Sequence, residues 1–221
     1  MNQAPSSAHS RPRRSRQEAQ AQTRDKLLEV AAHLFVEKGY GGTSLRDIAE
    51  QAGFTQGAFY SNFESKEALL LEMLRRHMQR EVGQLEEIVG NSEKRIEHVL
   101  NDLQAWASTI DADVAWSMLS IELQLHAQRS PDFAQAYQAV WVKHKSVLAH
   151  WIGQIFEAYK AQLPVDAESM ASAFMALAHG LALQRAATGS GASGSVMVLM
   201  LRGLIALSKE GPTCAPNAKK A

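Results

Sequence analysis

Apolar residues recur at helical spacing along almost the whole of the 221-residue chain. Leu27, Ala31 and Leu34, for example, follow the i, i+4, i+7 pattern of one helix face. No segment of the sequence shows the sustained alternation of apolar and polar residues that is typical of a strand. Glycine, proline and capping residues separate the periodic segments, and the sequence therefore predicts an all-α chain of about nine helices.

The chain divides into four parts by composition. Residues 1–20 are polar and contain four arginines before the first acid, which predicts a flexible basic arm. Residues 21–75 combine short and long periodic segments and predict a small N-terminal domain, with a helix-turn-helix at about 44–63. Residues 76–210 predict a larger helical domain, and residues 211–221 a tail.

Charge and cysteine content limit the class of protein. The formal net charge is zero, so any signal for nucleic acid must be local. A single cysteine, Cys214, leaves no disulfide framework and no cysteine-based zinc site, which is typical of a reducing cytoplasm. The N-terminus lacks an apolar secretory signal, and the most apolar run, residues 196–207, is too short to cross a bilayer. We expect a soluble cytoplasmic protein with no membrane partner.

Motifs for catalysis or cofactor binding are weak. Residues 189–194 read GSGASG and contain G-x-G-x-x-G, but they follow a predicted helix instead of a strand, so a loop is the better interpretation. The histidines show no metal-ligand spacing, and no nucleophile stands in a known motif. We expect no cofactor, no metal and no catalysis, because a helical-bundle enzyme would rest only on the presence of a pocket.

Two short helices are predicted on either side of a glycine turn. Ser44 and Asp47 have the spacing of a capping box for the first helix, which Gly53 ends. Thr55 can cap the second, and Phe59 is expected to point inward, together with Phe63 one turn later. Such a pair between longer helices is typical of a helix-turn-helix that places its second helix in the major groove of DNA.

The other side chains of the stretch GFTQGAFYSNF, residues 53–63, are small or can form hydrogen bonds. They are free for phosphates and base edges. This segment, with TSLRDIA at 43–49 and KEAL at 66–69, resembles the DNA-binding region of TetR-type transcriptional regulators. The resemblance covers roughly residues 24–75, and beyond it only the length and the helix count match.

The resemblance implies roles for single residues. Thr43, in front of a helix N-terminus, would grip a phosphate, and Arg46 would reach the backbone or a base. Gln56 would read bases, while Tyr60 and Lys66 would contact phosphates. The complete expected DNA-binding set is Thr43, Arg46, Thr55, Gln56, Gly57, Tyr60, Ser61, Asn62 and Lys66.

The last two predicted helices are apolar on more than one side, and residues 196–207 are apolar almost all round. A second copy of the chain can cover them by completing a four-helix bundle across a two-fold axis. The resemblance implies the same homodimer, and the alternative is that these helices form the core of a monomer.

Aromatic residues gather in the sequence between the two predicted regions. Taken singly, each is more often a core residue, but the resemblance implies a ligand cavity for a hydrophobic or amphipathic small-molecule effector. The candidate lining residues are Trp116, Tyr137, Trp141 and His144.

Together these patterns predict a sequence-specific DNA-binding transcriptional regulator. The resemblance implies a repressor that the effector releases from a pseudo-palindromic double-stranded operator, with the helix that begins at Lys66 as the lever. A ligand-independent architectural DNA-binding protein is the alternative, although it would call for a more basic surface. The arginine arm fits either a DNA contact or a solubilising tail.

Overall fold

The computed structural model describes residues 15–90, 96–112, 114–190 and 194–209. Within these ranges the chain forms nine helices and no strand, which confirms the predicted all-α class. The helices are α1 (Arg16–Gly42), α2 (Leu45–Gln51), α3 (Gln56–Tyr60), α4 (Lys66–Val89), α5 (Ile96–Ala112), α6 (Val114–Ala127), α7 (Pro131–Ala158), α8 (Ala167–Thr188) and α9 (Gly194–Lys209). None of these helices is long and apolar enough to cross a membrane.

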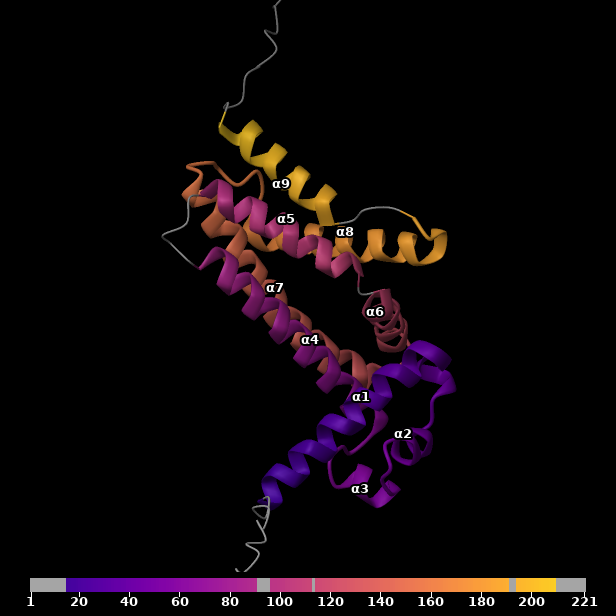
Figure 1. Ribbon diagram of the computed structural model, residues 1–221. Helices are drawn as coiled ribbons and strands as arrows, with labels where there is room; N and C mark the ends of the chain where they lie inside the picture. The colour runs from indigo at the N-terminus through magenta and orange to yellow at the C-terminus, as the bar shows by residue number, and fades with distance from the viewer. Residues whose placement is uncertain (1–14, 91–95, 113, 191–193, 210–221) are drawn as a thin grey trace, which may run out of the picture.

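The helices form an elongated molecule with two different ends (Figure 1). Helices α1, α2 and α3 gather at one end, and α4 leads away from them alongside α7. At the other end α9 packs on α5, and α8 packs on α7. Helix α6 packs against both α1 and α8, so it connects the two ends.

Helix α1 begins earlier than predicted. The Ser15 hydroxyl accepts a hydrogen bond from Glu18 N at 3.1 Å, and the Glu18 carboxylate accepts one from Ser15 N at 2.8 Å. This capping box starts the helix. The prediction of a flexible arm is therefore wrong for residues 16–20. The error arose because the capping box lies in a segment rich in arginine, which suggested a solvated tail. The rest of the predicted arm, 1–14, and the predicted tail, 211–221, lie outside the described residues.

The core consists of two apolar clusters. The first packs α1 to α4 together and continues into α6 and α7 through Leu119, Leu123 and Phe133. The second joins the C-terminal half of α4 to α5, α7, α8 and α9 around Leu100 and Phe156. The domain boundary predicted at residue 75 falls within α4, and the first cluster passes across it, so the N-terminal helices are packed firmly on the rest of the molecule.

Candidate nucleic-acid interface and effector cavity

The short helices α2 and α3 are each capped by a hydroxyl side chain. Ser44 Oγ accepts from Asp47 N at 3.1 Å, and the Asp47 carboxylate accepts from Ser44 N at 2.9 Å. Hydrogen bonds from Ser44 hold the pKa of Asp47 below its usual value. Gly53 turns the chain at φ 78°, and Thr55 Oγ1 accepts from Ala58 N at 3.2 Å. The predicted capping box, glycine turn and second cap are confirmed.

Helix α3 is held from behind by two aromatic rings and one arginine. Phe59 and Phe63 are 0% and 3% exposed, as predicted, and their ring centroids lie 5.7 Å apart. The guanidinium of Arg24 on α1 lies 4.1 Å from the Phe63 ring centroid, and its Nη1 donates to Asn62 O at 2.5 Å. Arg24 was not predicted, because its partners Asn62 and Phe63 are distant in the sequence and no local pattern marks it.

The outer side of α3 is open to solvent. Tyr60 is 58% exposed, although its ring meets the Phe59 ring edge-on at 6.0 Å. Arg46 on α2 is also exposed, with its Nε 2.7 Å from Glu50 Oε1. The exposed members of the predicted set are Arg46, Thr55, Gln56, Gly57, Tyr60 and Ser61. These exposed side chains are small or can form hydrogen bonds.

Two members of the predicted set point inward. Thr43 is 1% exposed, and its hydroxyl donates to Leu34 O at 3.1 Å and to Gly39 O at 2.9 Å. The hydroxyl therefore closes the end of α1 and is not available to the phosphate that we expected it to grip. Asn62 donates from Nδ2 to Ala58 O at 2.8 Å, and its Oδ1 is buried without a hydrogen-bond partner.

Lys66 holds the turn after α1 together. Its ammonium group donates to Tyr40 O and to Thr43 O, each at 2.8 Å, and lies 4.0 Å from the Tyr40 ring centroid. Partial burial lowers the pKa of Lys66. The side chain is thus directed at backbone carbonyls of its own chain, whereas the sequence analysis expected a phosphate clamp.

The C-terminal half of α6 contacts both α1 and α4 through polar side chains. The Glu122 carboxylate accepts a hydrogen bond from Tyr40 N, and His126 Nε2 lies 2.6 Å from Glu67 Oε1. The rings of His126 and Tyr40 are 4.6 Å apart between centroids. We call Gly39, Tyr40, Glu67, Glu122 and His126 the α6 joint. The sequence analysis missed it, because its contacts span tens of residues.

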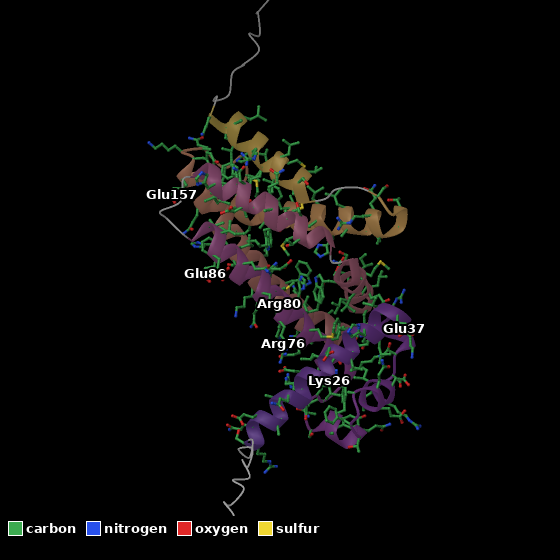
Figure 2. All side chains as sticks on the ribbon, in the orientation of Figure 1. Lys26, Glu37, Arg76, Arg80, Glu86 and Glu157 are labelled. Carbon is green, nitrogen blue, oxygen red and sulfur yellow. The ribbon has the colours of Figure 1, made fainter. Side chains whose placement is uncertain are left out.

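Helices α1 and α4 are also joined by charged side chains. Figure 2 shows Arg76 and Arg80 on the part of α4 that lies beside α1. Arg76 Nη1 lies 2.6 Å from Asp25 Oδ1 on α1, and Arg76 Nε lies 3.0 Å from Glu72 Oε1. The Arg76–Asp25 pair joins α4 to α1, whereas the Arg76–Glu72 pair lies within α4, and exposed pairs of this kind add little stability.

A cavity of about 220 Å³ lies among α4 to α9. Its lining is mostly apolar and includes all four tryptophans of the chain: Trp106, Trp116, Trp141 and Trp151. Three of the four predicted lining residues, Trp116, Trp141 and His144, lie on it. Tyr137 does not: it lines a neighbouring and more open groove between α6, α7 and α8, which shares Trp141 with the cavity, and burial raises its pKa to about 12.

One carboxylate stands among the apolar residues of this cavity. Glu81 Oε1 lies 3.3 Å from His77 Nε2, and Glu81 Oε2 lies 3.4 Å from His144 Nε2. His144 is only 7% exposed, and desolvation lowers its pKa against the opposing effect of Glu81. Trp116 stacks on His77 with ring centroids 3.7 Å apart. Glu81 was missed, although its spacing from Met78 and from Leu85 puts a charge on an apolar helix face.

Comparison with known proteins agrees with this geometry. The family model for bacterial regulatory proteins of the tetR family matches residues 27–73. The HTH-type transcriptional repressor KstR2 of Mycolicibacterium smegmatis is 28% identical over 151 residues, which cover 66% of this chain and 72% of that protein. KstR2 of Rhodococcus jostii is 43% identical over 68 residues, which cover 31% of this chain and 33% of that protein.

The fold is shared more widely than the sequence. A transcriptional regulator from Saccharomonospora viridis, solved in complex with choline, superposes with a TM-score of 0.64 over 84% of this chain and 96% of its own, at 21% identity. This likeness shows the fold alone. The matching family model, the repressor relatives and the capped pair α2 and α3 together lead to one conclusion: residues 27–73 form a DNA-binding domain of the tetR family of bacterial regulatory proteins, and the chain is a DNA-binding transcriptional regulator.

Proposed function

We propose that the chain is a homodimeric repressor that binds a pseudo-palindromic DNA operator through α3 and leaves it when a small molecule occupies the cavity. One observation carries the proposal: α6 lines the cavity with Trp116, Ser117 and Ser120, while Glu122 and His126 further along the same helix hold α1 and α4.

The link through α6 supplies a mechanism. A ligand that favours one position of Trp116 also favours one position of α6, because a helix moves as a stiff unit. The α6 joint passes that preference to α1 and to the start of α4, which carry α3. DNA affinity then falls by the difference in ligand affinity between the two arrangements. The sequence analysis assigned this transmission to α4 alone, and we now assign it to α6 and α4 together.

Exposed apolar residues on α8 and α9 support the homodimer. Leu183 on α8 is 47% exposed, and Leu199 and Leu207 on α9 are 67% and 68% exposed. Side chains of this size seldom cluster in contact with water on a monomer. A two-fold pairing of α8 and α9 would cover them and would set two copies of α3 for successive turns of the major groove.

The relatives support repression and a small-molecule effector. The two KstR2 proteins are named as repressors, and the structure from Saccharomonospora viridis holds choline. The α3 surface supports DNA reading in this chain through Gln56, Gly57 and Tyr60, with Arg46 on α2 beside them. We leave Thr43, Asn62 and Lys66 out of the direct contacts, because their polar side-chain atoms face their own chain.

Selection from a pool of random DNA duplexes tests the proposal. The purified protein is expected to enrich a pseudo-palindromic sequence, and fluorescence anisotropy is expected to show that the double variant Gln56→Ala, Tyr60→Ala no longer prefers it. A Glu157→Gln variant, altered on α7 at the far end of the molecule, serves as the control. Binding that depends steeply on salt but not on sequence would instead support an architectural DNA-binding protein.

A further inference from the structure

We propose that the cavity binds a protonated organic amine with an apolar body, and that the ammonium group sits at Glu81 between His77 and His144. This inference rests on the proposed function, because the amine would be the effector. It goes further by naming the chemical class that the cavity selects and the residues that select it.

The polar groups around Glu81 present hydrogen-bond acceptors. In His144, Nε2 faces the Glu81 carboxylate at 3.4 Å, which favours the tautomer with its proton on that nitrogen. The lone pair of Nδ1 then remains as an acceptor, and this atom is buried without a hydrogen-bond partner. In His77, Nε2 lies 3.3 Å from Glu81, and both ring nitrogens are buried without a hydrogen-bond partner. The carboxylate of Glu81 is the acceptor that matches the N–H donors of an ammonium group in this cavity.

The walls of the cavity suit the same group. All four tryptophans line it, and the face of an indole ring attracts a cation. One face of Trp116 is covered by His77, whereas Trp106, Trp141 and Trp151 come from α5 and α7 on other sides. The apolar remainder of the lining, which includes Leu103 and Ile155, would take up a hydrocarbon body.

The charges of the lining favour a cation over an anion or a neutral molecule. Glu81 has only imidazoles within ion-pairing distance among the described residues, and burial lowers the pKa of His144, which keeps that ring neutral near pH 7. Arg185, the other fully charged group on the lining, already has a partner of its own. A carboxylate ligand would meet the charge of Glu81 in a poorly solvated place, and an alcohol would leave that charge unpaired.

Four compounds with one hydrocarbon chain test the inference. Octylamine, octyltrimethylammonium, octanol and octanoate are titrated into the full-length protein, and the tryptophan fluorescence is followed. All four fluorophores line the cavity, so the intrinsic emission reports its occupancy. Octylamine is expected to bind about tenfold or more tightly than octanol and octanoate, because it alone combines charge with N–H donors for this site. Octyltrimethylammonium separates charge from hydrogen bonding and is expected to bind between octylamine and octanol.

A matched pair of variants on α4 locates the selectivity. Glu81→Gln keeps the shape of the side chain and removes its charge, and it is expected to abolish the preference for octylamine over octanol. Glu86→Gln makes the same chemical change on the same helix at an exposed position off the lining, and it is expected to keep the preference (Figure 2). Thermal unfolding of both variants checks that each retains the fold.

The outcomes separate this inference from the proposed function. Stronger binding of octanoate than of octylamine, an unchanged preference in Glu81→Gln, or no binding of octylamine up to millimolar concentration overturns the inference. The proposed function is tested on the selected operator. If octanoate releases the protein from that DNA, the proposal of an effector-released repressor is supported and the proposal of an amine ligand is wrong. If octylamine binds at Glu81 and DNA affinity does not change, the ligand class stands and the proposal of release by this cavity fails.

Discussion

The ammonium group of Lys66 donates a hydrogen bond to the carbonyl oxygen of Thr43 at 2.8 Å and a second one of equal length to Tyr40. It thereby joins the first turn of α4 to the segment between α1 and α2. Lys66 was expected to contact DNA, but it instead binds backbone carbonyl groups just before α2.

Replacement of Lys66 distinguishes a role in stabilising the fold from a direct contact with a DNA phosphate. Lys66→Met keeps most of the side-chain volume but loses both charged hydrogen bonds, and it is expected to lower the free energy of unfolding by about 2 kcal/mol. Urea unfolding measures this loss. DNA affinity is expected to fall without a change in its salt dependence, whereas loss of a phosphate contact would reduce the salt slope by about 1. Lys38→Met, at an exposed position of α1, is the control.

Gly39 is expected to be sensitive to any side chain. Its backbone lies at φ 74° and ψ 165°, a region that is almost closed to other residues, and a Cβ there would lie 3.0 Å from Glu122 Oε1. Gly39→Ala is expected to lower the free energy of unfolding by about 1–3 kcal/mol and to weaken the α6 joint. Gly41→Ala, in the same turn but with open space around its Cβ, should be nearly neutral by the same urea measurement.

Gln56 and Tyr60 are expected to contribute to DNA binding in different ways. Gln56→Ala should relax the preference at one base position of each half-site, by about 1–3 kcal/mol, because an amide can read a base edge. Tyr60→Phe removes only a hydroxyl group from an exposed side chain and should weaken binding to all DNA sequences by the same factor. Anisotropy titrations against operators with single substitutions separate the two patterns. Equal losses for every operator in Gln56→Ala would contradict base reading.

Stability at high pH should depend on Tyr40. Burial, with a contribution from Glu67, raises the pKa of Tyr40 from 10.0 to about 12. A phenol with a higher pKa in the folded state stabilises that state fully below pH 10, and this contribution is lost as the pH rises from 10 to about 12. The free energy of unfolding of Tyr40→Phe should therefore fall less steeply over this interval than that of the wild type. Parallel slopes in urea unfolding at each pH would rule out the contribution of Tyr40.

The exposed side of α9 should control the oligomeric state. Leu199→Arg places a charge on the surface that we propose to be covered by a second copy, and it should shift the protein to a monomer in sedimentation velocity experiments. Val36→Arg, a change of similar kind at a position that is 51% exposed on α1, should leave the oligomeric state unchanged. Equal masses for Leu199→Arg and the wild type would place the subunit contact elsewhere.

The starts of α2, α3 and α4 were predictable because their signals are local. Ser44 with Asp47, Thr55 and Ser65 cap helices through residues three positions away, and such pairs can be read directly from a sequence. Ser130 looks like another cap, yet its hydroxyl makes no capping bond and donates to Glu67, 63 residues earlier. Ser130 is the N-cap of α7 by its backbone position, but a tertiary contact takes its side chain.

The roles of single site residues were less predictable, because family position fixes where a residue stands in the chain and not what it bonds to. Thr43 and Lys66 stand where expected, and their partners are carbonyl groups that only the folded turn brings near. Tyr137 lies one helical turn before Trp141 and lines the same open groove, but only Trp141 also lines the cavity, which lies further along α7. Periodicity could have revealed Glu81, because a charge on an apolar helix face requires a partner.

In helix α6, Trp116 lines the cavity, whereas His126 contacts α4 near the other end of the helix. Trp116 and His126 are ten residues apart, which corresponds to about 15 Å along the helix axis. The cavity-lining residues of α6 can therefore be exchanged for others without changing those that contact α1 and α4. If the proposed function holds, the ligand specificity can be redesigned at Trp116, Ser117 and Ser120 while Glu122 and His126 preserve the response.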